Sequence, residues 1–130
     1  MGAYASEADL EERYGAQEIR QRRGTLPFSA VDQALEDADA EIDAYLGRRY
    51  ALPIAPVPRL LVTLACQLAR ARLLGDAITE TARNDQKAAR AQLAELRDGK
   101  QRLLGVSEVG VTVGSGSVQQ FSGERLFKRS

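Results

Sequence analysis

The sequence contains no histidine. Histidine titrates nearest to neutral pH, and it is the commonest general base and transition-metal ligand in proteins. Its absence excludes a Ser-His-Asp triad and any histidine-ligated metal centre. We therefore expect no catalytic residues, no cofactor site and no metal site, and an enzyme is the weakest of the functional interpretations.

Cysteine is nearly as scarce, because Cys66 is the single example. One cysteine excludes an intrachain disulfide and a cysteine-based zinc site. Cys66 lies in an apolar stretch, so we interpret it as a small buried hydrophobic residue. The amino end is acidic and lacks the apolar run of a signal peptide, and no apolar stretch reaches the ~20 residues that cross a membrane. These observations predict a soluble protein made in a reducing cytoplasm, without membrane contact.

Aromatic residues and net charge are also low. Aromatics make up 5% of the chain, tryptophan is absent, and 18 Lys and Arg residues balance 18 Asp and Glu residues. A net charge of zero gives no global basic field that would attract nucleic acid. The core must be built mainly from Leu, Ala, Val and Ile. Such a core is thin for a monomer, and burial against other subunits would add to it.

Helical periodicity is the strongest positive signal, and it is clearest between residues 29 and 74. Ser29 is a favourable N-cap, with Asp32 three residues later in a capping-box arrangement. Prolines at 53, 56 and 58 then prevent a continuous helix. The stretch from Arg59 to Asp76 is apolar almost all round, which predicts the central core helix. The apolar stripe expected on the first of these helices is Val31, Ala34, Leu35, Ala38, Ile42, Tyr45 and Leu46.

Shorter helical segments are expected around these two helices. Ser6 begins one that ends at Gly15, a second turn spans residues 16–22, and residues 24–27 form a loop. A long polar helix follows Thr79 and runs from about Glu80 to Arg97. The residues expected to face inward are Ala8, Leu10 and Tyr14 on the first segment, and Ala82, Ala89, Leu93 and Leu96 on the long helix.

The chain changes character near residue 104. Leu103 and Leu104 are expected to anchor to the core, but the remainder is rich in glycine, serine and threonine. The alternation of Val109, Val111 and Val113 is a weak strand signal, and residues 114–117 read as a flexible linker. We therefore predict an all-α fold, a small bundle of about four helices around a central apolar helix. The helical domain is expected over residues 1–104, and an extended carboxyl-terminal tail with room for a short β segment over residues 105–130.

The tail ends in an aromatic and basic segment. A segment this polar cannot build its own core, yet its large apolar side chains would gain nothing in solvent. We therefore favour a tail that docks on a partner, and the alternative is a tail that stays flexible. The residues expected to make this contact are Phe121, Arg125, Leu126, Phe127, Lys128 and Arg129.

An acidic run on the first long helix resembles the start of a calcium-binding loop. Its alternating acids extend from Asp37 to Asp43, but Ile42 stands where such a loop needs glycine. On a helix these carboxylates also spread around the cylinder and cannot converge on one ion. We interpret them as a solvated or partner-facing acidic surface.

The order of motifs in the chain resembles a known family. Residues 4–15, YASEADLEERYG, fit the form YA-x-x-ADL-x-x-R-[FY]-G, and residues 34–53 fit A-x-x-DA-x-x-EID-x-YL-x-x-RY-x-LP. Residues 58–72, PRLLVTLACQLARAR, follow P-x-x-L-x-x-LACD-x-ARY, with Gln67 where an acid is common. In this order and spacing they resemble the Mu-like prophage family of small head–tail connector proteins. The resemblance covers residues 4–97 well and residues 121–129 loosely.

The resemblance implies a structural protein without catalysis or cofactor. Related connectors form a ring, usually twelve-fold, beneath the portal of a tailed phage. Packaged DNA passes through that ring without sequence-specific binding, and a stopper or tail-completion protein joins its far side. The expected location is the virion neck, after assembly in the host bacterial cytoplasm. The tail is expected to dock on the portal or on a neighbouring subunit.

A closed ring of identical subunits needs two different, complementary faces on each subunit. One long helix of the sequence supplies an acidic surface, and the other supplies a basic one. The candidate residues are Asp32, Glu36, Asp39 and Asp43 on the acidic side, and Arg83, Lys87 and Arg90 on the basic side.

The alternative function is a small helical regulatory or DNA-binding module. The basic residues Arg20, Arg22 and Arg23 would contact phosphates if neighbouring helices formed a helix-turn-helix. Zero net charge and the acidic central helix oppose this interpretation. Salt-dependent binding to duplex DNA separates the two functions, because a connector is expected to bind it weakly.

Overall fold

The computed structural model describes residues 3–26, 29–103, 106 and 108. Within them the chain forms five α-helices and one 3-10 turn, and its only strand-like pairing is an isolated antiparallel bridge between Tyr50 and Glu108. The predicted all-α bundle is thus confirmed. The helices are α1 (Glu7–Tyr14), α2 (Ala16–Thr25), α3 (Ala30–Leu46), α4 (Arg59–Leu74) and α5 (Glu80–Asp98), with the 3-10 turn η1 (Gly75–Ala77) before α5.

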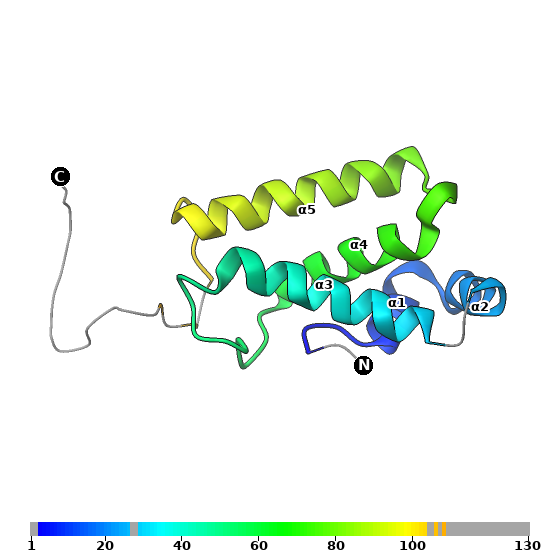
Figure 1. Cartoon of the computed structure of the whole chain (residues 1–130), viewed down its shortest axis with the longest axis horizontal. Coiled ribbons are helices and arrows are strands. Elements are labelled where there is room, and N and C mark those ends of the chain that lie inside the picture. Colours follow the sequence, from blue (N-terminus) through cyan, green and yellow to red (C-terminus); the bar gives the residue numbers. More distant parts are fainter. Residues whose placement is uncertain (1–2, 27–28, 104–105, 107, 109–130) are drawn as a thin grey trace, which may run out of the picture.

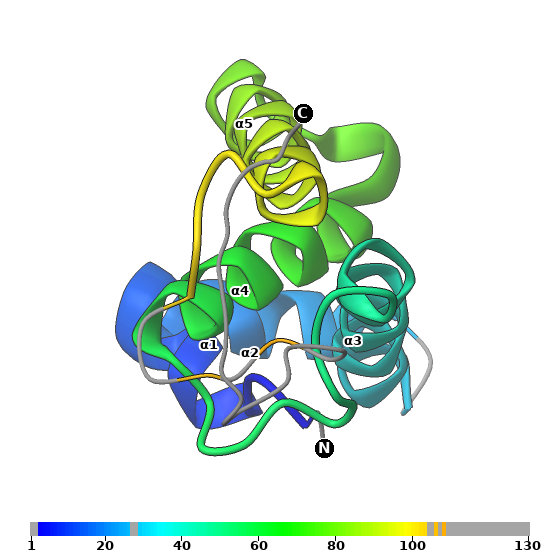
Figure 2. The same cartoon turned by 90° about the vertical axis from the view of Figure 1, so that its left-hand side faces the viewer.

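Helix α4 is the centre of the bundle, as its apolar composition predicts. It contacts α3, α5 and α1, and Figure 2 shows it lying between α5 above and the α1–α2 pair below. In Figure 1, α3, α4 and α5 run along the length of the molecule, and α2 lies at one end. Leu61, Leu64 and Leu68 of α4 are among the largest fully buried side chains. Burial on several sides at once makes this helix the main source of hydrophobic stabilisation.

The capping box predicted at Ser29 does not form. Ser29 occupies the N-cap position of α3, but its side chain makes no capping hydrogen bond. Its backbone has φ −91° and ψ 7°, whereas a capping side chain reaches the first turn from an extended backbone. The same pair of residue types does form a capping box at α1: Asp9 N–H donates to Ser6 Oγ at 3.3 Å, and Ser6 N–H donates to Asp9 Oδ2 at 2.9 Å.

The inward-facing stripe of α3 is confirmed, with Tyr45 half-buried at its margin. Two other local predictions are wrong. Helix α2 continues through Thr25, so Gly24 lies inside it, because the buried Ile19 anchors this helix and a single interior glycine costs only ~1 kcal/mol. Ala8 is exposed, whereas Leu10 is buried and Tyr14 is half-buried.

Helix α5 matches its prediction closely. Thr79 Oγ1 accepts a hydrogen bond from Ala82 N–H at 3.1 Å, and the buried residues are Ala82, Ala89, Leu93 and Leu96. The helix ends at Gly99 with φ +82°, a left-handed conformation that favours glycine. A Cβ atom at Gly99 would also lie 2.7 Å from Arg49 Nη2. Arg49, three residues beyond the end of α3, donates from Nε to the Arg97 carbonyl at 3.1 Å and so caps the carboxyl end of α5.

The chain after α5 returns to the end of α3. Leu103 N–H donates to Tyr50 Oη at 3.1 Å, and Glu108 accepts from Arg49 Nη1 at 3.3 Å. Leu103 is buried, which confirms its predicted anchoring role. Leu104, the valine alternation at 109–113 and the aromatic and basic segment at 121–129 lie outside the described residues. The domain boundary near residue 104 stays a prediction.

Candidate assembly interface

The acidic surface of α3 begins with a contact to the amino-terminal strap, residues 3–5. The backbone N–H groups of Ala3 and Tyr4 both donate to the Asp39 carboxylate. Tyr4 Oη donates to the Asp43 carboxylate and accepts from Ile54 N–H at 3.2 Å. Asp39 and Asp43, both candidate intersubunit residues, are therefore engaged within the chain.

Burial dominates the electrostatics of this contact. Tyr4 is only 3% exposed, and burial together with its hydrogen bond to Asp43 raises its pKa to about 12. Burial also raises the pKa of the Asp39 carboxyl, although the two strap N–H groups oppose that rise. The strap thus joins α3 to the proline-rich elbow, residues 51–58, through one phenol group.

The outer part of the acidic surface remains open to solvent. Asp32 and Glu36 are both exposed and lie one turn apart on the same face as Asp39 and Asp43. Glu36 makes no ion pair within the described part of the chain. The predicted acidic face therefore exists, but only its half nearer the start of α3 faces outward.

The basic candidates on α5 divide in the same way. Arg90 Nε lies 2.6 Å from Glu41 Oε2, and Arg72 Nη2 lies 3.1 Å from Glu41 Oε1. One carboxylate thereby joins α3, α4 and α5. Arg83 and Lys87, by contrast, are exposed, and neither forms an ion pair with any described residue.

The Glu41 contact predicts a pH-dependent part of the stability. Burial alone would raise the pKa of Glu41, but Arg90 and Arg72 outweigh it and hold the pKa below its ordinary value of 4.5. A lowered carboxyl pKa stabilises the fold above pH 4.5, and this contribution is lost as the pH falls through the lowered value. We expect Glu41→Gln to cost about 1 kcal/mol at pH 7, because both arginines are partly exposed.

The measurement is the free energy of unfolding of wild type and Glu41→Gln in urea between pH 7 and pH 3. The difference in unfolding free energy between wild type and Glu41→Gln should become smaller below pH 4.5. Glu36→Gln, on the exposed face of the same helix, is the control and should stay within ~0.5 kcal/mol of wild type. A difference that does not change with pH would contradict the role assigned to Glu41.

The basic cluster on α2 is largely satisfied within the chain. Arg23 Nε donates to Glu7 Oε2 at 3.2 Å, and Arg22 also interacts inside the molecule. Nearby, Arg70 Nε donates to Glu18 at 2.9 Å and its guanidinium lies 4.3 Å from the centre of the Tyr14 ring. An ion pair therefore occupies Arg23, and Arg22 also has a contact within the chain, so of the three arginines that the DNA-binding alternative assigned to phosphates Arg20 is the exposed one.

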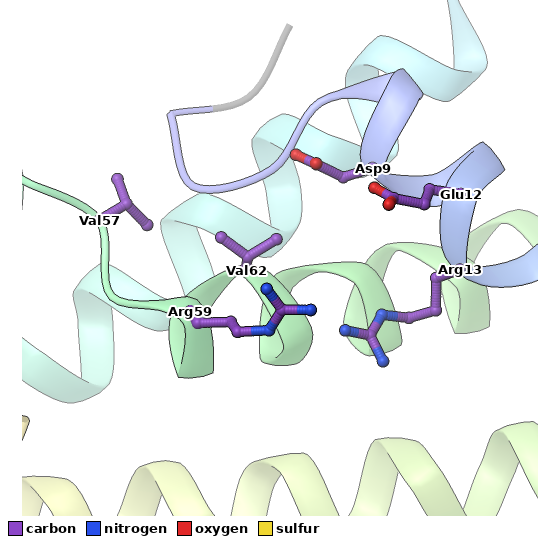
Figure 3. Close-up of a pocket in the computed structure, with 6 residues that line it drawn as sticks. All are labelled: Asp9, Glu12, Arg13, Val57, Arg59 and Val62. Atoms are coloured by element: carbon purple, nitrogen blue, oxygen red, sulfur yellow. The ribbon is translucent and has the colours of Figure 1, made fainter.

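A groove opens between α1, the end of the elbow and the start of α4 (Figure 3). Its volume is about 550 Å³, and its lining residues are Asp9, Glu12, Arg13, Val57, Arg59 and Val62. Sequence reasoning missed this groove, because its walls come from two segments far apart in the sequence, α1 and residues 57–62. No periodicity along either of them signals that they meet.

The core of the described chain contains one free thiol. Cys66 is fully buried, as predicted, and burial raises the pKa of its thiol to about 11. Among the described residues no three His, Cys, Asp or Glu side chains are grouped to hold a metal ion. Nor is any described helix both long and apolar enough to cross a bilayer.

The fold and its surfaces define a small all-α protein with exposed acidic residues on α3 and exposed basic residues on α5. Comparison with known proteins then places it: the chain belongs to the family described as Bacteriophage Mu, Gp36, which it matches over residues 4–122. It is 35% identical to "Mu-like prophage FluMu protein gp36" of Haemophilus influenzae over 120 residues, 88% of this chain and 84% of that protein. It is 33% identical to "Gene product J" of Escherichia phage Mu over 103 residues, 75% of this chain and 73% of that protein. The Mu-like resemblance of its motifs is confirmed.

Proposed function

We propose that this protein is a structural head–tail connector, which forms a ring beneath the portal of a Mu-like tailed phage. The observation that carries the proposal is membership of a Mu phage family over residues 4–122. An all-α bundle with opposite charges exposed on two different helices supports it, because a ring of identical subunits needs two complementary faces. The related connectors that the motifs resemble imply a twelve-fold ring in the virion neck.

The described contacts narrow the proposed subunit interface. Asp39 and Asp43 already hold the amino-terminal strap, and Arg90 already holds Glu41. Exposure therefore makes Glu36 on α3 the better acidic candidate, with the exposed Asp32, which also has a contact within the chain, one turn away, and these face Arg83 and Lys87 on α5 of the next subunit. Each pair is spaced four residues apart, so the charges of each lie close together on one helix face.

The rest of the proposed assembly follows from the same role. Residues 121–129 dock on the portal, a stopper or tail-completion protein joins the far side of the ring, and packaged DNA passes through without sequence-specific binding. A zero net charge suits that passage, because tight phosphate contacts would hold the DNA.

Reversing both exposed charges on α5, with Arg83→Glu and Lys87→Glu, is expected to weaken ring formation on the portal. The matched control reverses Arg20 and Arg48, two exposed arginines elsewhere on the molecule. Adding Asp32→Lys and Glu36→Lys to the first pair should restore the ring, since the attraction is then recreated with opposite sign. The measurement is the fraction of portals that carry a ring in electron micrographs. Rings equally abundant in all variants would rule out this interface.

The connector role itself is tested by mixing the chain with the portal encoded by the same phage. A second sample is truncated after Val113, which keeps the contacts of Glu108 with Arg49. A ring that is lost on truncation would support both the connector role and the tail as its anchor. A ring that survives would keep the role and move the anchor to the bundle. Failure of both chains to bind would overturn the proposal.

The regulatory or DNA-binding alternative lacks a supporting observation. Arg23 is paired with Glu7, and the described surface has no cluster of unengaged arginines on α2. Tight duplex binding that weakens steeply with salt would revive this alternative and count against the connector.

A further inference from the structure

The groove between α1 and α4 combines both signs of charge with an apolar surface. Figure 3 shows the carboxylates of Asp9 and Glu12 on the α1 side, the guanidinium groups of Arg13 and Arg59 along α4, and Val62 beside Arg59. Val57 extends the apolar surface toward the elbow. A volume of about 550 Å³ accommodates several side chains of a peptide.

Two of the four charged residues are already committed to local contacts. Asp9 is held by Ser6 in the capping box, and Arg13 Nη2 donates to Thr63 Oγ1 at 2.9 Å. Glu12 and Arg59 are exposed and form no ion pair in the described part of the chain. The groove thus offers one carboxylate on α1 and one guanidinium at the start of α4, in a lining that also contains two half-buried valines.

A fitting occupant has large apolar side chains for the two valines, a base for Glu12 and an acid for Arg59. The carboxyl-terminal segment, residues 121–129, contains these groups: Glu124 and Arg125 precede Leu126 and Phe127, and Lys128 and Arg129 follow. Its charges complement Arg59 and Glu12 respectively. Covering a Phe or Leu side chain contributes about 1.5–3 kcal/mol, which an isolated polar tail cannot obtain from itself.

The length of chain before this segment permits the contact. Glu108 is fixed beside Arg49 at the end of α3. The twelve residues from 109 to 120 extend up to about 40 Å. Helix α5, the longest at 19 residues, is only about 28 Å long. The segment can therefore reach any face of its own subunit, and a tether of this length gives an effective concentration on the order of millimolar.

We propose that, in the free protein, the groove holds the carboxyl-terminal segment of its own chain. Leu126 and Phe127 cover Val57 and Val62, Lys128 pairs with Glu12, and Glu124 pairs with Arg59. This contact does not depend on the connector role. If the connector role holds, the portal must draw the segment out of the groove, so the groove shields an adhesive tail until the correct partner arrives.

The test places a photo-crosslinker on the tail of the full-length chain, as Phe127→p-benzoylphenylalanine, in the absence of any portal. After irradiation, mass spectrometry should locate cross-links in residues 9–13 or 57–62, within the monomer band. Glu12→Arg should lower the cross-link yield about fivefold, and combining it with Lys128→Glu should restore it. Glu12 is exposed and Lys128 lies in the tail, so neither charge reversal should disturb the core. Circular dichroism checks that the helices persist.

The control variant is Glu36→Arg, which reverses an exposed charge on α3 away from the groove and should leave the yield unchanged. Cross-links scattered over the surface, or a yield equal in Glu12→Arg and wild type, would overturn the proposal. So would a dimer band carrying the groove cross-link, because the occupant would then be the tail of another copy. None of these results bears on whether the chain forms a ring on a portal.

Discussion

Replacing Leu68 by alanine is expected to lower the free energy of unfolding by about 3 kcal/mol. Leu68 is fully buried in α4, the helix that contacts α1, α3 and α5. A Leu→Ala change at such a site loses the transfer energy of the removed atoms and leaves a cavity, which together cost about 2–5 kcal/mol. Because a domain of this size is stable by only about 5–15 kcal/mol, the variant should be close to unfolding under mild stress.

The measurement is urea denaturation followed by circular dichroism, and the matched control is Leu52→Ala. Leu52 in the elbow is 43% exposed, so the same chemical change should cost less than about 1 kcal/mol there. Equal losses at the two positions would show that α4 is not the centre of the core. The m-values of both variants should match wild type, since the surface exposed on unfolding is nearly the same.

The parts of the fold that are predictable from sequence are those specified by neighbouring residues. Helix α5 was predicted to within one residue at its end, because Thr79 supplies a cap, Gly99 supplies a left-handed stop, and its stripe repeats at helical spacing. Helix α4 was equally clear, because three prolines separate it from α3 and apolar residues cover nearly its whole surface.

Local signals failed where backbone angles or tertiary packing decide the outcome. Ser29 has the right chemistry for a cap, but its backbone does not aim the hydroxyl at the first turn. Gly24 reads as a helix breaker, yet α2 continues past it because Ile19 packs into the core. At Gly24 packing against the core overrides a weak local preference, whereas at Ser29 the backbone angles decide the outcome.

The candidate interface illustrates the same limit. The acidic and basic residues lie on the helices that were predicted for them, but their partners were not foreseen. Asp43 bonds a phenol 39 residues before it, and Arg49 closes a helix end 48 residues after it. Tyr4 entered the sequence argument only as part of a family motif, because nothing in its neighbourhood indicates that the strap crosses α3. Pairing at such separations is a property of the folded chain alone.

Loss of the Tyr4 hydroxyl should also destabilise the fold strongly. The substitution Tyr4→Phe is expected to lower the free energy of unfolding by about 1–3 kcal/mol at pH 7. The hydroxyl both donates to Asp43 and accepts from the Ile54 backbone. Its removal leaves a buried N–H group and a carboxylate without their partner, which costs more than the net value of an ordinary hydrogen bond. The ring itself is retained, so the variant leaves no cavity in the core.

The same substitution should remove a pH dependence at the alkaline end. The pKa of Tyr4 is raised from 10.0 to about 12 in the folded protein. A raised pKa means that the stabilisation is fully present below pH 10.0 and is lost as the pH rises through about 12. The measurement is therefore the difference in unfolding free energy between wild type and Tyr4→Phe, from pH 8 to pH 12. Taking the difference cancels the titration of the lysines and the other tyrosines. This difference in unfolding free energy should become smaller above pH 10.0. A difference that stays constant with pH would show that the phenol does not join the strap to α3 and the elbow.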